Sequence, residues 1–465
     1  MNALPEKDEK SGKGKNKMAL NVSTDIANIL KVYYKDGVEN LLFRESPIVK
    51  SIGKTRVEGK QQNFAAVYGA GGAVSGKFTQ AKAKAAEVVK NAEFQVTPGQ
   101  LFSTYSMNAK EVQSSLTKKG AYMKVAGNKL FAATSALRRT LAAAFYGDGY
   151  GVIGNCPSSA TISTTGTQVT FTDGSIPATL DVGSVVQLVA SKGASDADST
   201  KAEVTAIEDY KVTFAAATSN IAVTASTMIR LHGSVDNSGN PLLPMGLAGW
   251  LPTDRTGLST SFFGVNRSIS PDRLAGVLVD SHATNEAKKV TIQKAINRVR
   301  RHGSKADLIV MNDEDFLAFA AELESTNTYF TATSTKEAKK GSIGFREVSA
   351  SFSTNYIDNI VDDPYCPKGR FYVLDKDSVE FWSYTNADFV DNGIAGNNPG
   401  KEDVMDFDNE GKANDPAKLL IDDYINVQPG SGSDDGPDVL VTLQLFGSYV
   451  VLNPANCAVG LFYQA

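Results

Sequence analysis

The sequence predicts an α+β protein of several structural units, with an all-β unit inserted between two mixed regions. Three observations support this prediction. A largely amphipathic helical run extends from Asn108 to Gly147, residues 157–235 change to short alternating strands, and helical and strand patterns mix from Ser270 onward. At 465 residues the chain exceeds the length at which a single hydrophobic core usually stops growing. We therefore expect more than one core.

The N-terminal region predicts an arm. Residues 1–20 are rich in lysine, glycine and glutamate, a composition typical of disorder in an isolated monomer. Residues 25–43 carry apolar side chains at roughly helical spacing and end before Ser46 and Pro47, which indicates a helix.

Two extended segments then predict a protruding two-stranded arm. A strand around residues 64–68 runs into a cluster of glycines, and a matching extended segment returns at residues 94–107. Lysines lie between them. Because an isolated hairpin is marginally stable in water, we expect this arm to lean on a partner.

The long helix begins, on this interpretation, at Asn108, because Glu111 three residues later gives capping-box spacing. Gly147 would end it. Its apolar stripe is Met123, Leu130, Thr134, Leu137, Leu141 and Phe145.

Short alternating runs at 167–171, 185–189, 202–207 and 211–214 predict a small β-barrel or sandwich. Downstream, we expect elements at 274–281 and 291–301, a strand at 308–311 and a helix at 314–323. The final stretch, 439–462, reads as strands interrupted at Asn453 and Pro454.

Composition excludes several classes of protein. No run of eighteen apolar residues occurs, and residues 1–20 lack the hydrophobic segment of a signal peptide, so we expect neither secretion nor membrane insertion. Cys156, Cys366 and Cys457 are far apart and show no CxxC spacing, which argues against disulfides and a zinc site. Reduced thiols in a cytoplasm fit this pattern best.

Charge is distributed unevenly, although the net charge is only −4. Residues 50–90 hold eight basic and two acidic side chains, a net of +6, whereas residues 401–438 hold eleven acidic and three basic ones, a net of −8. Opposite patches on one chain favour head-to-tail contact between copies. The candidate intersubunit contacts are Lys77, Lys82, Lys84, Lys90, Asp406, Asp408, Asp422 and Asp423.

Motifs for catalysis or cofactor binding are weak. Residues 149–154 match GxGxxG, but a helical run precedes them and Pro157 follows, so a glycine-rich helix exit is the simpler interpretation. The three histidines are not at metal-ligand spacing, and no GxSxG, HExxH or P-loop motif occurs. We expect no catalytic residues, cofactor or metal site. A nucleotide bound at stoichiometric ratio would instead support an enzyme.

The order of these parts resembles the major capsid protein of tailed bacteriophages, the Hong Kong 97-like capsid fold. Four phrases carry the resemblance: AFYGDGYG at the end of the long helix, GLAGW at 246–250, GSKADLIVMNDEDFLAF at 303–319 and LFGSYVVLNPANCAVGLF at 445–462. The resemblance implies the following division: an N-terminal arm (1–56), an extended loop (57–107), a peripheral domain with the spine helix (108–156), an inserted β domain (157–235), an axial domain with linking segments (236–430) and a C-terminal return to the peripheral domain (431–465).

The resemblance further implies a shell of hexamers and pentamers enclosing double-stranded DNA that is bound without sequence recognition. About fifty residues precede the extended loop, too few for a fused scaffolding domain, so a separate scaffolding protein is expected, with portal and auxiliary or decoration proteins. The location implied is the virion, assembled in the host bacterial cytoplasm, without a membrane. An encapsulin-like compartment shell and another virion component such as a tail tube remain alternatives. No motif identifies residues for covalent cross-links between subunits.

Overall fold

The computed structural model describes most of the chain in segments. The described residues are 48–49, 52–57, 59–69, 74–83, 89–108, 125–157, 160–171, 176–208, 210–217, 220–303, 307–325, 350–352, 355–357, 359–384, 426–429 and 438–463. The predicted arm helix at 25–43 lies outside them, as do Lys84 and the four aspartates Asp406, Asp408, Asp422 and Asp423.

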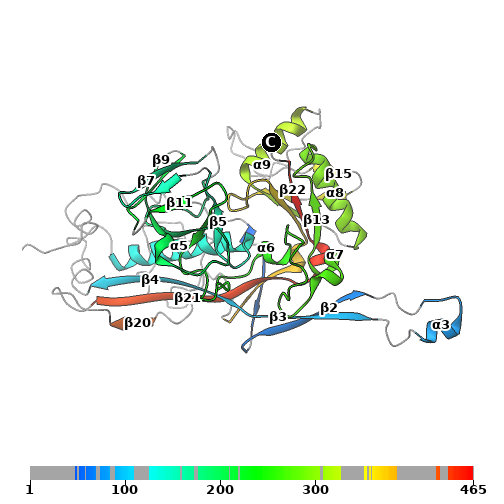
Figure 1. Cartoon of the computed structure of the whole chain (residues 1–465). Helices are drawn as coiled ribbons and strands as arrows, with labels where there is room; N and C mark the ends of the chain where they lie inside the picture. The colour runs from blue at the N-terminus through cyan, green and yellow to red at the C-terminus, as the bar shows by residue number, and fades with distance from the viewer. Residues whose placement is uncertain are drawn as a thin grey trace, which may run out of the picture.

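The first layer is a sheet beneath a long helix (Figure 1). The sheet has the order β1-β19-β21-β20, and β4 also pairs with β21. The strands are β1 (Gly53–Arg56), β4 (Gly99–Asn108), β19 (Val379–Ser383), β20 (Asn426–Pro429) and β21 (Asp438–Val451). Helix α5 (Val125–Tyr146) packs on β4 and β21.

The sequence prediction is confirmed for the last turns of α5, where Leu137, Leu141 and Phe145 recur at every fourth residue and are all buried. The predicted start of the helix, with Asn108 as its capping residue, stays a prediction, because residues 109–124 lie outside the described residues. Asn108 is the last residue of β4 and pairs with Asp438 of β21. A helix N-cap itself has extended backbone, so this strand position is compatible with the predicted capping role.

A second sheet, β13-β22-β18-β14-β17, forms the other mixed layer with helices α8 and α9. Its strands are β13 (Val277–Asp280), β14 (Leu308–Met311), β17 (Asn359–Asp362), β18 (Arg370–Leu374) and β22 (Ala458–Leu461). The helices are α7 (Pro271–Leu274), α8 (Lys288–Arg301) and α9 (Asp313–Ser325). The predicted strand 308–311 and helix 314–323 are confirmed, and the elements expected at 274–281 and 291–301 are β13 and part of α8.

The C-terminal segment is divided between the two sheets. Strand β21 belongs to the first sheet, and after the short 3₁₀ turn η5 (Pro454–Asn456) β22 pairs with β13 and β18 of the second. That residues 431–465 return to a peripheral domain stays a prediction; the β19–β21 ladder ends at Val451, before the turn at Pro454.

Residues 152–231 form an all-β unit with its own core. The larger sheet has the order β5-β12-β8-β9-β10-β7, and β11 pairs with β6. The strands are β5 (Val152–Asn155), β6 (Ala160–Ile162), β7 (Thr167–Thr170), β8 (Val185–Val189), β9 (Lys201–Glu208), β10 (Lys211–Phe214), β11 (Ile221–Val223) and β12 (Met228–Leu231), with the 3₁₀ turn η2 (Asp198–Thr200) before β9. That this unit is an insertion stays a prediction.

Two ion pairs connect the all-β unit to α5 and the turn that follows it. Arg139 of α5 lies 2.6 Å from Asp181, and Lys192 lies 2.7 Å from Asp148. Arg139 is largely buried, so this pair is screened less than a surface pair.

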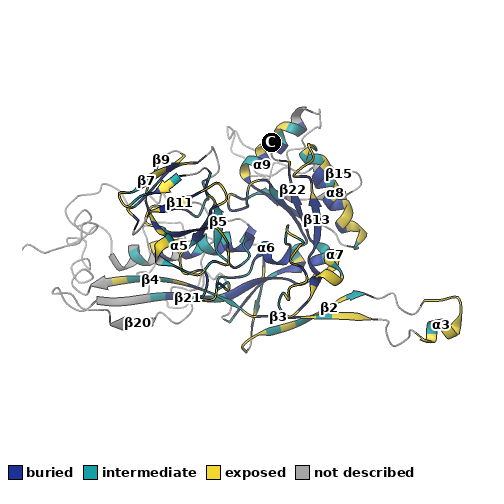
Figure 2. Cartoon of the chain, viewed as in Figure 1, coloured by how far each residue is buried: buried dark blue, intermediate teal, exposed yellow. Residues whose placement is uncertain are grey.

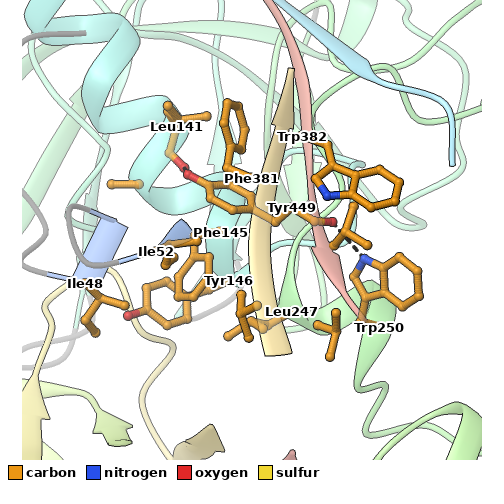
Figure 3. Packing of buried hydrophobic residues seen from close by; sticks show 14 of the residues in the cluster. Ile48, Ile52, Leu141, Phe145, Tyr146, Leu247, Trp250, Phe381, Trp382 and Tyr449 are labelled. Atoms are coloured by element: carbon orange, nitrogen blue, oxygen red, sulfur yellow. Dashed lines mark hydrogen bonds between the residues drawn. The ribbon is translucent and has the colours of Figure 1, made fainter. Parts of the chain in front are cut away.

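The central core lies between α5, the first sheet and the short helix α6 (Leu247–Trp250). In Figure 3, Trp250 donates a hydrogen bond from Nε1 to the carbonyl of Tyr449, at 2.8 Å. The buried Tyr146 hydroxyl donates to the Asp363 carboxylate, at 2.8 Å, which connects the end of α5 to the second sheet. These two buried donors are thus paired across long sequence separations.

Candidate assembly interface

The most exposed feature of the described chain is a hairpin that projects from one end (Figure 1). It consists of β2 (Gln62–Gly69) and β3 (Lys90–Val96), with the short helix α3 (Phe78–Ala83) at the tip. Antiparallel pairs run from Gln62 with Val96 to Gly69 with Lys90. The two-stranded arm is present as predicted, but its returning strand was predicted at 94–107 and lies at 90–96. Residues 99–107 belong to β4, which pairs with β21 of the first sheet.

The base of the hairpin packs against aromatic side chains of the same molecule. Phe64 stacks on Phe94 at a centroid distance of 5.1 Å, and Phe94 lies 5.3 Å from Trp250. Phe94 is completely buried. We call Phe64, Phe94, Trp250, Phe262, Phe263 and Trp382 the aromatic root.

Hydrogen bonds reinforce the aromatic root. The backbone N–H of Gln95 donates to the carbonyl of Phe263 at 2.9 Å. Arg273 donates from Nη1 to the carbonyl of Tyr68 at 2.6 Å. The sequence predicted that the whole arm would lean on a partner; the root shows that its base leans on its own chain.

The tip differs from the root in both exposure and charge. Val74 is 95% exposed and Phe78 79% exposed, and no side chain of α3 is buried (Figure 2). Lys77 and Lys82 lie in this exposed segment, and Lys90 is exposed at the start of β3. A rigid base therefore presents an apolar and basic tip to solvent.

The structure describes only three of the eight residues that we predict to form contacts between subunits. Lys77, Lys82 and Lys90 lie together on the hairpin. Lys84 and the acidic candidates Asp406, Asp408, Asp422 and Asp423 lie outside the described residues, so their contact with the lysines stays a prediction.

The aromatic root was not predicted from the sequence. Its members come from four segments separated by up to about three hundred residues, and only the Phe262–Phe263 pair and the tryptophan of GLAGW offered a local signal. Large aromatic residues bury much area and prefer contact with one another, so a search of the sequence for segments rich in them could have predicted the aromatic root.

The GxGxxG segment begins in the turn after α5, and its last three residues, 152–154, lie in β5. Gly149 and Gly151 have φ angles of 82° and 70°, and a Cβ on Gly151 would lie 2.6 Å from the Cβ of Ser234. The glycines therefore permit left-handed backbone and close packing. A strand follows them, so no helix N-terminus is present to receive a phosphate.

Other candidate chemistry is limited in the described segments. No group of three or more His, Cys, Asp or Glu side chains is arranged there to hold a metal ion. No helix among those segments is both long and apolar enough to span a membrane. His232 lies 3.4 Å from Asp196, which also lies 3.7 Å from Arg230 and accepts a hydrogen bond from the backbone N–H of Gly233.

Known structures with a similar fold are capsid and shell proteins. A chain of the cyanophage A-1(L) capsid asymmetric unit matches at a TM-score of 0.51 with 15% identity, covering 94% of this chain and 98% of that chain. The encapsulin SrpI of Synechococcus elongatus PCC 7942 gives 0.42 with 8% identity (96% and 99% covered), and the capsid of a native GTA particle gives 0.42 with 9% identity (96% and 100% covered).

The cyanophage match has a TM-score above 0.5 and supports the assignment of the fold. The chain has the Hong Kong 97-like capsid fold, which the sequence predicted. No protein-family model and no curated protein sequence matches the chain.

Proposed function

We propose that this chain is the major capsid protein of a tailed bacteriophage, a structural subunit that forms an icosahedral shell of hexamers and pentamers around double-stranded DNA. The observation that carries the proposal is the likeness to the cyanophage capsid chain along nearly the full length of both chains. At 15% identity that likeness supports the fold, and the surfaces of this molecule supply the argument for assembly.

The hairpin is the first of these surfaces. Its root is fixed by buried aromatic packing, whereas its tip exposes Val74 and Phe78. Contiguous exposed apolar surface is uncommon on monomeric soluble proteins and marks interaction sites. Because the tip projects away from the rest of the molecule, a neighbouring copy can cover it without rearrangement of the core.

The expected partners follow from this assembly. Identical copies meet in rings, and a separate scaffolding protein, a portal and auxiliary or decoration proteins would complete the particle. The subunit would assemble in the bacterial cytoplasm and reside in the virion. DNA would be enclosed without base recognition.

Expression of the full chain, alone and with candidate scaffolding proteins, tests the proposal. We expect closed shells in negative-stain electron micrographs and a fast-sedimenting fraction. DNA protected from nuclease in particles from infected cells would support a phage capsid, whereas shells that enclose protein cargo would support the compartment alternative. Tubes would favour a tail protein, and a monomer under every condition would contradict the proposal.

A further inference from the structure

Helix α8 is the most strongly basic helix among the described residues. It carries six basic and no acidic side chains, whereas α9 beside it carries five acidic and no basic ones. Helix stability alone does not explain this composition, because Lys288 and Lys289 lie in the first turn, where the helix dipole disfavours cations. A contact outside the helix explains the charge better.

One side of α8 is buried and the opposite side is exposed. The buried side packs with α9 in the hydrophobic core of the second sheet through Ile292, Ala295, Ile296 and Val299. Lys294, Arg298 and Arg301 recur at helical spacing on the other side and are exposed (Figure 2). We call these three residues the basic stripe.

Carboxylates of the same molecule neutralise mainly the first half of the helix. Asp315 pairs with Lys288 and Glu286 pairs with Lys294, each at 2.5 Å. The carboxylate of Glu322 accepts a hydrogen bond from the backbone N–H of Lys288 at 2.8 Å. These contacts place the acidic groups around the start of α8.

The second half of α8 keeps its positive charge. Arg298 donates from Nη1 to the carbonyl of Leu278 at 2.7 Å, a bond that orients the guanidinium without neutralising it. In the described segments no carboxylate forms an ion pair with Arg298 or Arg301. Asp280, at the end of the neighbouring strand β13, accepts from the backbone N–H of His282.

The basic stripe has the chemistry of a phosphate-binding surface. Arg, Lys and Asn side chains are common donors to DNA phosphates, and the exposed Asn297 lies within the stripe. From Lys294 to Arg301 the helix rises about 10 Å, which is about the axial rise of three phosphates along one DNA strand. The spacing of the cations therefore suits a polyanion with closely spaced charges.

An acidic surface of a second copy fits the stripe less well. Helix α9 is the acidic helix of the described chain, but Glu314 is already paired with Lys368 and Asp315 with Lys288. Few of its charges are left for the cations of a neighbour. Duplex DNA has an unpaired negative charge at every phosphate.

We propose that the basic stripe binds the phosphate backbone of duplex DNA, and that the α8 side of the second sheet therefore faces the interior of the shell. The inference rests on the proposed function, since it requires a shell that encloses DNA. Phosphate contacts carry no sequence information directly, so the binding is not sequence-specific. The stripe lies away from the hairpin tip, so both surfaces can be occupied at once (Figure 1).

The salt dependence of DNA binding by the full-length, unassembled chain tests the contact. Fluorescence anisotropy with a short mixed-sequence DNA duplex gives the slope of log affinity against log salt concentration. Conversion of Lys294, Arg298 and Arg301 to Gln should reduce the magnitude of this slope by about 0.9 for each lost phosphate contact, or about 2.7 for all three. Circular dichroism and thermal unfolding check that the variant is folded.

The matched control converts Lys60, Lys201 and Lys211 to Gln. These lysines are exposed and lie outside α8, so the same loss of charge should leave the slope unchanged. A wild-type slope from the basic-stripe variant would overturn the inference, as would an equal reduction in the control. Wild-type DNA binding together with lost shell assembly would mean that the stripe meets an acidic protein surface, and would overturn it too.

DNA-filled particles test which side of the subunit faces the interior. Because the three native cysteines are buried, a photoactivatable label can be attached selectively at Asn297→Cys within the stripe. Irradiation of particles with nuclease-protected DNA should link that DNA to the labelled subunit, and much less to a subunit labelled at Thr79→Cys on the hairpin tip. Filled particles without the Asn297→Cys adduct would overturn the inference alone, whereas shells that never contain DNA would contradict the proposed function.

Discussion

At the scale of residues, the same type of side chain has opposite roles at the two ends of the hairpin. Phe94 is completely buried in the aromatic root, and Phe78 is 79% exposed at the tip. Phe94 therefore contributes to the stability of the monomer. Phe78 is not buried by any described part of the chain, so we expect it to contribute little to folding.

Replacement of each phenylalanine by alanine separates these roles. Phe94→Ala should lower the free energy of unfolding by about 3–5 kcal/mol, because it removes a fully buried aromatic side chain. Phe78→Ala should change it by less than about 0.5 kcal/mol, as is usual for surface positions. Urea unfolding of the unassembled chain measures both, and equal losses would contradict the division into root and tip.

Buried thiols and phenols predict an alkaline limit to stability. Burial raises the pKa of Cys156 to about 11 and that of Cys457 to about 12, from an ordinary 9.0, and raises the pKa of Tyr372 to about 12 from 10.0. Burial, followed by the nearby charge of Asp363, raises the pKa of Tyr146 well above its ordinary value.

The unfolded chain loses these protons from about pH 9 upward, whereas the folded chain keeps them, so stability is complete below pH 9 and falls as pH rises. Each such group should contribute a slope of about 1.4 kcal/mol per pH unit above its unfolded pKa. Urea unfolding between pH 7 and 11 measures this slope. Tyr372→Phe should reduce the slope by the contribution of one group. A free energy of unfolding that stays constant up to pH 11 would contradict the prediction.

At the scale of elements, close backbone contact positions α6 against the end of α5. Gly246 precedes α6, and a Cβ there would lie 2.0 Å from the carbonyl oxygen of Ala144. This contact brings Leu247 and Trp250 into the core beside Phe145 (Figure 3). Close packing against the end of α5 therefore requires a glycine at the first position of the GLAGW phrase.

Gly246→Ala should destabilise the chain by about 1–3 kcal/mol or more, because backbone atoms must move to admit the methyl group. Gly257→Ala is the matched control: nothing lies within 4 Å of its added Cβ, and its φ angle is not in the left-handed region. That substitution should be neutral or stabilise by up to about 1 kcal/mol. Thermal unfolding of the two variants measures the difference, and equal melting temperatures would show that α6 adapts.

At the scale of the whole molecule, a compact body carries a projecting arm at one end and an all-β unit toward the other (Figure 1). The first sheet shares a hydrophobic core with the long helix, the second sheet has a core with α8 and α9, and the all-β unit has a third; no described residue of the arm tip belongs to any of them. The body of the molecule buries its apolar side chains, whereas the arm tip leaves its apolar side chains exposed. Under the proposed function, neighbouring copies would cover the arm tip.

Charge reversal at the arm tests whether electrostatics guide that assembly. Conversion of Lys77, Lys82 and Lys84 to Glu should impair particle formation and leave the monomer folded, because these residues carry much of the basic patch opposed to the acidic stretch 401–438. Sedimentation at low and high salt measures the effect. Reversal of Lys211, Lys289 and Arg301 gives the same charge change away from the arm, and normal particles from the arm variant would contradict the prediction.

The sequence by itself determined what depends on local periodicity. The stripe Leu137, Leu141 and Phe145, the alternating strands of the all-β unit and the two strands of the arm are visible in it, because each pattern repeats within a few residues. It also showed the lysines of the arm and the glycine turn at 149–154. These features follow from side chains that neighbour one another along the chain.

Only the tertiary structure decided which distant segments meet. Asn108 is a strand residue because Asp438 pairs with it, β22 joins the second sheet because β13 and β18 receive it, and Phe94 is buried because Trp250 covers it. No local pattern specifies such contacts, since their free energy depends on groups up to several hundred residues away. The rigid root of the arm, and with it the exposure of the tip, arises from that long-range packing.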